Sequence, residues 1–185
     1  DVPNYGSVLQ TFATQEIFRQ MGLIPCVLNY KRITSLSIKR RVLEAVKDDS
    51  FVKRMVKSVV YFFYFAYQEK VFASFRSQYL IMSKATLTSE EEFKKLSIDS
   101  DIYCTGSDQT WNNEWYGHVL KSFFLTFVPK GIKKISYASS FGRLSLPEDE
   151  KQEVKKYLES YDAISLREES GVKLVEQLGV NGAVH

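Results

Sequence analysis

The chain reads DIYCTGSDQTWN from Asp101 to Asn112. The residues as far as Thr105 predict a short buried strand. At Gly106 this run ends, and the side chains that follow carry hydroxyl, carboxylate and amide groups. A buried strand that runs straight into a glycine and a polar loop is typical of an open α/β sheet, in which ligands bind beyond the carboxyl ends of the strands.

The same order of strand and loop recurs along the 185 residues. Further strands are predicted at 25–30, 134–139 and 163–166, and helices at 7–21, 87–96, 147–160 and 169–178. Strands that alternate with helices favour an α/β fold with a mostly parallel sheet and helices on both faces. We therefore expect a single domain over residues 1–185, with the loops after its strands at one edge of the sheet.

Residues 31–97 interrupt this alternation and are interpreted as a helical insertion. Residues 36–80 contain neither Gly nor Pro, and apolar residues recur at helical spacing from Val52 to Tyr67, so two or more helices are expected. Six of the seven residues of the run YFFYFAY, 61–67, are Phe or Tyr. This aromatic cluster is either the inner face of solvated helices or an exposed contact surface, and the exposure of its side chains distinguishes the two.

Charge is distributed unevenly. The 25 Lys and Arg residues against 22 Asp and Glu residues give a net charge of only +3, which does not predict a nucleic-acid-binding protein. Residues 31–57 hold nine basic and three acidic residues, and nine minus three is a local charge of +6. Such a stretch is typical either of solvated helices or of a segment that binds an anionic membrane surface or acidic glycan. The longest apolar run, Val59–Tyr67, is far shorter than the ~20 residues that span a bilayer.

Composition and cysteine usage suit a globular protein of a reducing compartment. With 44% hydrophobic and 25% charged residues, the chain is neither disordered nor of low complexity. Cys26 and Cys104 each sit in an apolar run without metal-type spacing, so we expect two buried free thiols, no metal site and a cytoplasmic location. The sequence begins without Met and ends in what reads as an unfinished strand after Gly182, so we expect a piece of a longer protein.

Three loops that follow predicted strands are the candidate binding segments, at 106–112, 139–143 and 165–168. Gly106 would let the backbone approach a ligand closely. The candidate ligand-binding side chains are Ser107, Asp108, Gln109, Asn112 and Ser140, with Trp111 as a surface that could stack on a sugar ring. The alternative for the first loop is an Asx-type turn that only ends the strand.

Two further positions could bind an anion. One is the segment before the first predicted helix, made of Asn4, Tyr5 and Gly6. Backbone N–H groups at a helix N-terminus attract anions, although an ordinary helix cap is the alternative. The other is Arg167, which could bind a phosphate or carboxylate bidentately, or be held in a salt bridge with Glu168 or Glu169. We expect Arg143 to lie on the solvated surface.

Taken in order, these segments resemble the polysaccharide pyruvyl transferase family. The matching segments are NYGSVLQ at 4–10, DIYCTGSDQTWN at 101–112, FFL at 123–125, ISYASSFG at 135–142, ISLRE at 164–168 and SG at 170–171. They cover nearly the whole chain outside residues 31–97, and their combination is specific although each is weak alone. Thr110, where the family pattern has Val, and Ser139, where it often has Ala, are mild departures.

The resemblance implies both a fold and an activity. Members look like two Rossmann-like halves of the glycosyltransferase-B kind that face a cleft, so this chain would be the N-terminal half without its first strand. They transfer pyruvate from phosphoenolpyruvate, as a ketal, to a sugar of a cell-surface polysaccharide, and no further cofactor is implied. The other half would supply most contacts to phosphoenolpyruvate, and this chain would supply the acceptor side of the cleft.

Ketal formation needs a proton donor and acceptor, and cationic groups around phosphate and carboxylate. Asp108 is the candidate general base, and Arg167 is the candidate anion ligand. The acceptor would be a saccharide or a lipid-linked glycan, and the basic and aromatic insertion could contact the inner face of the membrane. The chain alone is expected to be inactive, because a two-sided cleft needs groups from both halves.

Two other functions fit the same residues. A nucleotide-sugar glycosyltransferase of the same fold would consume a nucleotide sugar, whereas a sugar- or anion-binding module would bind its ligand without turnover. Phosphate released from phosphoenolpyruvate only in the presence of a glycan acceptor would identify the pyruvyl transferase.

Overall fold

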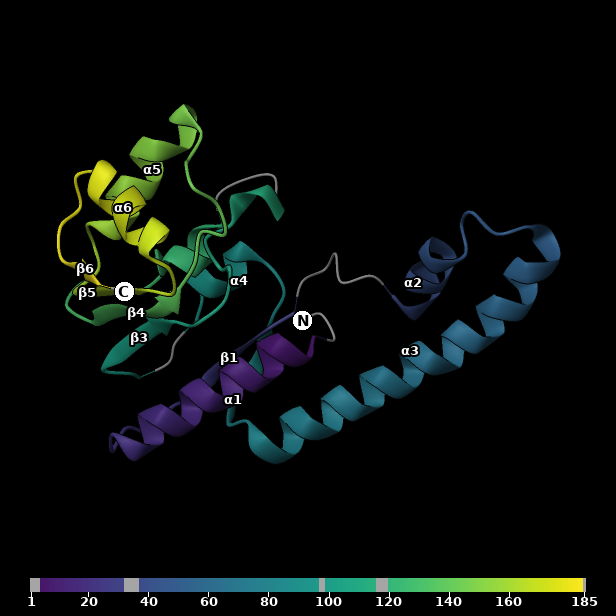
Figure 1. Cartoon of the computed structure of the whole chain (residues 1–185). Coiled ribbons are helices and arrows are strands. Elements are labelled where there is room, and N and C mark those ends of the chain that lie inside the picture. The colour runs from purple at the N-terminus through teal and green to yellow at the C-terminus, as the bar shows by residue number, and fades with distance from the viewer. Residues whose placement is uncertain (1–3, 32–36, 97–98, 116–119, 185) are drawn as a thin grey trace. The chain divides into compact units, whose positions relative to one another are not determined.

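The computed structural model describes residues 4–31, 37–96, 99–115 and 120–184. The chain divides into two compact units, Asp1–Thr88 and Ser89–His185, and each is described on its own. Figure 1 shows the helices and strands of both units, coloured along the chain. The organisation of the whole chain as a single Rossmann-like domain stays a prediction.

The first unit is built around a parallel pair of strands. Its elements are α1 (Tyr5–Gln20), β1 (Val27–Tyr30), α2 (Ile38–Ala45), α3 (Phe51–Tyr79) and β2 (Met82–Leu87). Parallel strands need a long crossover connection, and α2 and α3 lie within the connection from β1 to β2. The prediction that residues 36–80 are mainly helical is confirmed over the described residues.

The strands of the first unit differ from the sequence prediction. The strand expected at 25–30 forms, but it pairs with β2 in a separate two-stranded sheet and not with the strands of the second unit. β2 was absent from the predicted elements. Its sequence MSKATL has three consecutive exposed residues and only Leu87 buried, so it lacks the alternation that marks a strand.

α1 covers the second half of α3. The ring of Phe12 lies 5.9 Å from the rings of both Phe75 and Tyr79. Gln15 is only 2% exposed; its Nε2 donates to the carbonyl of Tyr79 (3.0 Å), and its Oε1 accepts from the N–H of Ile81 (2.7 Å). An amide side chain thereby satisfies backbone groups where α3 ends and β2 begins.

α2 packs against α3, with Arg41 at the middle of the longer helix. The Arg41 guanidinium lies 4.1 Å from the centre of the Phe65 ring, and it donates to Gln68 Oε1 (3.0 Å). Of the side chains of α3, only Phe72, in the half that α1 covers, is buried. Within the described residues, no helix combines the length and the apolar character that a membrane-crossing segment requires.

The second unit contains a four-stranded parallel sheet in the order β3-β4-β5-β6. Its elements are α4 (Glu90–Lys94), β3 (Ile102–Thr105), two 3₁₀ turns (Asn113–Trp115 and Lys121–Phe124), β4 (Lys133–Ser139), α5 (Glu148–Leu158), β5 (Ala163–Leu166), α6 (Glu169–Gln177) and β6 (Ala183–Val184). The predicted strands and helices of this region are confirmed, except that the helix expected at 87–96 shortens to α4. β6 confirms the strand expected at the end of the sequence.

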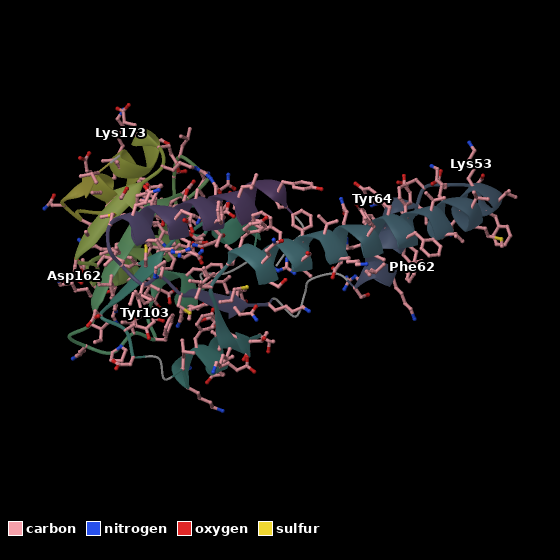
Figure 2. All side chains as sticks on the ribbon, turned by 90° about the horizontal axis from the view of Figure 1, so that it is seen from below. Lys53, Phe62, Tyr64, Tyr103, Asp162 and Lys173 are labelled. Carbon is pink, nitrogen blue, oxygen red and sulfur yellow. The ribbon has the colours of Figure 1, made fainter. Side chains whose placement is uncertain are left out.

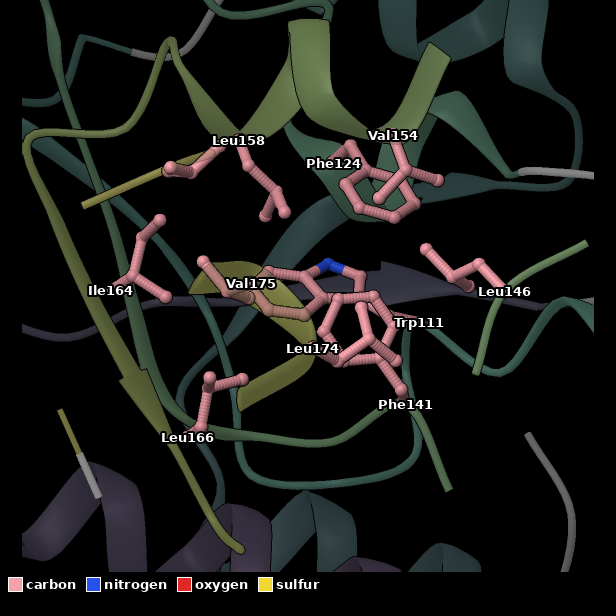
Figure 3. Close-up of a cluster of buried hydrophobic side chains, with 11 residues drawn as sticks. Trp111, Phe124, Phe141, Leu146, Val154, Leu158, Ile164, Leu166, Leu174 and Val175 are labelled. Atoms are coloured by element: carbon pink, nitrogen blue, oxygen red, sulfur yellow. The ribbon is translucent and has the colours of Figure 1, made fainter. Parts of the chain in front are cut away.

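The core of the second unit surrounds Trp111. Figure 3 shows the cluster, in which Trp111, Phe124 and Phe141 are fully buried. α5, α6 and β5 each contribute two apolar side chains, which are Val154 and Leu158, Leu174 and Val175, and Ile164 and Leu166. Because side chains two positions apart in a strand share one face, α5 and α6 cover the same face of this sheet. Helices on both faces stay a prediction for the whole chain.

The two cysteines have different environments. Both are free thiols, as predicted. Cys104 lies in β3, and burial raises the pKa of its thiol to about 12. Cys26 is exposed, which corrects the prediction of two buried thiols, because β1 begins only at Val27 and Cys26 precedes it.

Candidate functional site

Three loops of the second unit leave the sheet at one edge. Because β3, β4 and β5 are parallel neighbours, the residues after their carboxyl ends lie at the same edge. These residues are Gly106 after β3, Ser140 after β4 and Arg167 after β5. The predicted common edge for the three loops is therefore confirmed within the second unit.

Ser139 joins the three loops through its own polar atoms. Its Oγ lies 3.0 Å from the carbonyl of Thr105 and 3.2 Å from that of Gly106. Its carbonyl accepts a hydrogen bond from the N–H of Arg167 (3.0 Å). Ser139 is fully buried, so these bonds fix the relative positions of the strand ends.

Ser140 connects the first loop to a carboxylate. Its N–H donates to the carbonyl of Asp108 (3.0 Å), and its carbonyl accepts from the N–H of Trp111 (3.2 Å). Its hydroxyl donates to Glu168 Oε1 (2.7 Å). Since Ser140 is fully buried, its contacts hold the loop and Glu168 in place.

Arg167 is held at the edge by Glu168. The Arg167 Nε lies 3.5 Å from Glu168 Oε2, so the salt bridge that the sequence allowed does form. Side-chain exposure is 35% for Arg167 and 30% for Glu168. A guanidinium that is oriented by a carboxylate and still meets solvent can also bind an anion.

Asp108 lies in the first loop and is half-buried. Its Oδ1 accepts from the N–H of Gln109 (2.8 Å), a bond within its own loop. The side chain of Asp108 therefore helps to shape its loop, and both the proton-accepting role and the Asx-turn alternative stay predictions. Beside it, apart from Gly106 and its two chain neighbours, no heavy atom of the described residues lies within 4 Å of where a Cβ at Gly106 would stand, so the backbone there is open to a ligand.

Gly142 closes the second loop onto the first. Its φ is +63°, and a Cβ there would stand 2.8 Å from the side chains of Asn112 and Gln109. Asn112 is only 3% exposed, and its Nδ2 donates to Gln109 Oε1 (3.3 Å). Glycine fits this position because it allows both the left-handed backbone and the close approach. The side chains of Asn112 and Gln109 therefore pack closely against the second loop at Gly142.

Trp111 does not form a surface for a sugar ring. It is fully buried, with its ring stacked on Phe124 (5.4 Å between ring centres) and tilted against Phe141 (5.2 Å). Its indole N–H donates to the carbonyl of Phe123 (3.0 Å). The predicted stacking role is wrong because the loop turns the indole into the core, where its large apolar area and its one donor are both satisfied.

The sequence prediction missed an ion pair beside the second loop. Arg143, expected on the solvated surface, has a side chain only 9% exposed and pairs with Glu150. Glu150 also accepts from Asn113 Nδ2 (2.9 Å), so it links both loops to α5. The sequence signal for this pair is weak, because Glu150 lies among three acidic residues of the first turn of α5 and any of them could be the partner.

Asn4, Tyr5 and Gly6 belong to the first unit and are therefore considered separately. Asn4 is the N-cap of α1, and its Oδ1 accepts from the N–H of Gly6 (2.8 Å). The Tyr5 ring lies 4.7 Å from the ring of Phe72 and is 62% exposed. The helix-cap alternative is confirmed, and anion binding by these residues stays a prediction.

Two hollows of the second unit lie at the opposite edge of the sheet. One of about 390 Å³ includes Asp99, Tyr103 and Ile132 in its lining, near the starts of β3 and β4. Another of about 290 Å³ lies near the starts of β5 and β6. The candidate residues line neither hollow, so the candidate site rests on strand order and loop chemistry.

Comparison with known proteins identifies the family. No curated protein and no solved structure matches the chain. The sequence model of one family, described as polysaccharide pyruvyl transferase, matches residues 4–185, so the match includes the insertion as well as the segments at the sheet edge. The chain therefore belongs to the polysaccharide pyruvyl transferase family.

Proposed function

We propose that this chain forms the acceptor-side half of an enzyme that transfers pyruvate from phosphoenolpyruvate, as a ketal, to a sugar of a cell-surface polysaccharide. The observation that carries the proposal is the common edge of the three loops in a chain matched to this family over residues 4–185. The rest of the site would come from a second half of the glycosyltransferase-B kind. The free thiols favour a cytoplasmic location, where phosphoenolpyruvate is available.

The reaction sets the groups that the site must supply. Protonation of the phosphoenolpyruvate methylene carbon makes the neighbouring carbon electrophilic, and one sugar hydroxyl adds to it and loses its proton. A second hydroxyl then displaces phosphate, which leaves with that hydroxyl's proton. The site therefore needs a group that moves protons and cationic or N–H groups around the phosphate and carboxylate.

Asp108 is our candidate for the proton acceptor. It is half-buried at the edge, close in sequence to the open backbone at Gly106, and its carboxylate is oriented by the N–H of Gln109. An oriented, partly exposed carboxylate can take the proton of an approaching hydroxyl. Ser107 and Gln109, also partly exposed in this loop, would bind other acceptor hydroxyls.

Arg167 is our candidate for the anion ligand, with Glu168 and Ser140 as positioning residues. Ser140 holds one oxygen of Glu168, and the other oxygen faces the Arg167 Nε. This chain of contacts orients the guanidinium before an anion arrives. Preorganised charge of this kind stabilises a transition state without a further reorganisation cost.

The test is a phosphate-release assay with phosphoenolpyruvate, with and without a glycan acceptor, on this chain and on the protein with both halves. We expect acceptor-dependent release from the protein with both halves and none from this chain alone. Asp108→Asn should lower kcat more than acceptor binding, because the amide keeps the shape and loses the basicity. Asp101→Asn, at the other end of the same strand, is the matched control and should leave both unchanged.

Other outcomes assign the chain differently. Wild-type kcat in Asp108→Asn would leave that residue as a loop former only. Arg167→Lys should raise KM for phosphoenolpyruvate, since an ammonium cannot replace a bidentate fork. Consumption of a nucleotide sugar would identify a glycosyltransferase, and glycan binding without any turnover would identify a binding module.

A further inference from the structure

From Val52 to Tyr67, α3 exposes an apolar face that the other elements of the first unit leave uncovered. Its exposed side chains recur at intervals of three and four residues, so they lie along one side of the helix. They are Val52 (71% exposed), Val56 (64%), Val59 (58%), Phe63 (68%) and Tyr67 (68%), with Phe51 and Met55 beside them. We propose that this face docks the α2–α3 hairpin onto an anionic lipid surface.

The neighbouring elements of the first unit leave this face free. α2 packs on another side of α3, where Arg41 covers Phe65 and binds Gln68, while Tyr61 stacks 5.9 Å from Phe65. The aromatic contacts of α1 with α3 are in its second half, at Phe72, Phe75 and Tyr79. Figure 2 shows the side chains of Phe62 and Tyr64 projecting from α3 in the half that bears this face.

The charges around this face are complementary to anionic headgroups. No acidic residue occurs from Phe51 to Gln68, whereas Lys53, Arg54 and Lys57 all lie there. Lys57 is paired with Asp49, just before α3 (2.8 Å), so Lys53 and Arg54 carry most of the uncompensated charge of this half. Among the described residues, Lys53 has no carboxylate partner, and Figure 2 shows it near the N-terminal end of α3. α2 adds further cations, so the hairpin presents positive charge beside its apolar face. Each cation held near an anionic bilayer adds about 1 kcal/mol to binding.

The length and composition of α3 favour a helix that lies in the membrane surface. Its three cations within the first seven residues and its polar second half rule out a spanning position, in agreement with the absence of any spanning helix among the described residues. A helix with one apolar face and flanking cations instead buries that face at the boundary between headgroups and acyl chains.

A second copy of the chain fits this face less well. Packing α3 against α3 in parallel would bring Lys53 and Arg54 near their counterparts, and the nearest carboxylate before the helix, Asp49, is already paired with Lys57. An anionic bilayer supplies the opposite charge and an apolar layer together. The proposal does not depend on transferase activity, so a negative result for membrane binding would not contradict the proposed function, and the reverse also holds.

Vesicle sedimentation tests the proposal. The chain should sediment with vesicles that contain phosphatidylglycerol at low salt, bind vesicles of phosphatidylcholine alone far more weakly, and dissociate as salt rises. Phe63→Ser should weaken binding about tenfold, from the lost apolar burial. Lys53→Gln with Lys57→Gln should weaken it about thirtyfold.

Matched variants keep the test specific. Ile24→Ser removes an apolar side chain that is 95% exposed in the turn before β1, and it should leave vesicle binding unchanged. In a Phe63→Trp variant, the tryptophan emission should shift to shorter wavelength when anionic vesicles are added, because the introduced ring leaves water. Circular dichroism of each variant confirms that the helices remain.

Three results would overturn the proposal. The first is no sedimentation of the wild-type chain with anionic vesicles at low salt. The second is binding that Phe63→Ser and the double Lys→Gln variant leave at the wild-type level. The third is a dimer that Val59→Asp dissociates and that excludes vesicle binding, which would assign the face to a second copy of the chain.

Discussion

Two aromatic clusters of this chain have opposite surroundings. Trp111, Phe124 and Phe141 are fully buried in the second unit, whereas Phe63 and Tyr67 on α3 are each 68% exposed. The first cluster lies between a sheet and two helices, and the second lies on a helix that α2 covers on one side only. Aromatic content alone therefore does not identify a core; the number of packed layers decides it.

The largest expected effect comes from removing the centre of the buried cluster. Trp111→Ala should reduce the free energy of unfolding by about 3–5 kcal/mol, because it leaves a cavity lined by two aromatic rings. Phe63→Ala on α3 should change it by less than about 0.5 kcal/mol. Urea unfolding of both variants measures the contrast, and equal losses would show that Phe63 is packed in solution.

The next largest expected effect is a difference in reactivity between the cysteine of the first unit and that of the second unit. Because burial raises the pKa of Cys104 to about 12, almost none of its thiol is ionised at pH 8. We expect alkylation at pH 8 to be roughly a hundredfold slower at Cys104 than at the exposed Cys26. Alkylation rates of the Cys26→Ser and Cys104→Ser variants show which cysteine gives the fast phase and which gives the slow phase. Similar rates would mean that β3 opens readily.

Stability should also fall in alkaline solution through Cys104. Its pKa is raised in the folded state, so between about pH 9 and pH 12 the unfolded chain loses this proton while the folded chain keeps it. Folded-state stability is therefore lost as pH rises through this window. Cys104→Ala should flatten the decline in urea midpoints measured across it, and an unchanged slope would assign the decline to other groups.

Gly142 gives a smaller and more local effect. Gly142→Ala should cost about 2–3 kcal/mol, since the alanine must adopt φ of +63° and displace Asn112 and Gln109. Gly131→Ala is the control, because its φ is +90° with no described atom within 4 Å, and it should cost about 1 kcal/mol. Thermal unfolding distinguishes the two, and equal costs would show that the loop adjusts freely.

The smallest expected difference concerns two tyrosine hydroxyls. The Tyr161 hydroxyl lies 2.9 Å from Thr105 Oγ1 inside the second unit, so Tyr161→Phe should cost about 1 kcal/mol. The Tyr64 hydroxyl accepts from Gln68 Nε2, and because the Tyr64 side chain is 51% exposed, Tyr64→Phe should be neutral within about 0.3 kcal/mol. A larger loss for Tyr64→Phe would reverse the comparison.

The sequence predicted most elements of the fold because their patterns are local. The strands at Ile102–Thr105 and Ala163–Leu166 are short runs between clear loops, and the helices follow from spacing and caps such as Ser89 with Glu92. β2 escaped prediction because three consecutive residues of its six are exposed, so the alternation of a half-buried strand is missing. Its pairing with β1 is set by a contact across residues 31–81, which no local pattern records.

The site was predicted only in outline. Strand order places Gly106, Ser140 and Arg167 at one edge, and that follows from parallel topology. The direction of individual side chains does not, because it depends on which neighbour fills each space. The burial of Trp111 in the core and the ion pair of Arg143 with Glu150 both depend on packing that the sequence does not show.

The parallel pairing of β1 with β2 has a consequence for the order of events on the ribosome. Translation proceeds from the N-terminus, so β1 is made before residues 31–81 and before its partner strand. At roughly 5–20 residues per second, its partner strand follows several seconds later. In that interval the valines and aromatic residues of α3 are already outside the tunnel, ahead of the Ile81 N–H and the strand that complete the first unit. The nascent chain thus displays its most apolar helix before its first sheet exists, when a nearby chaperone or bilayer competes directly with folding.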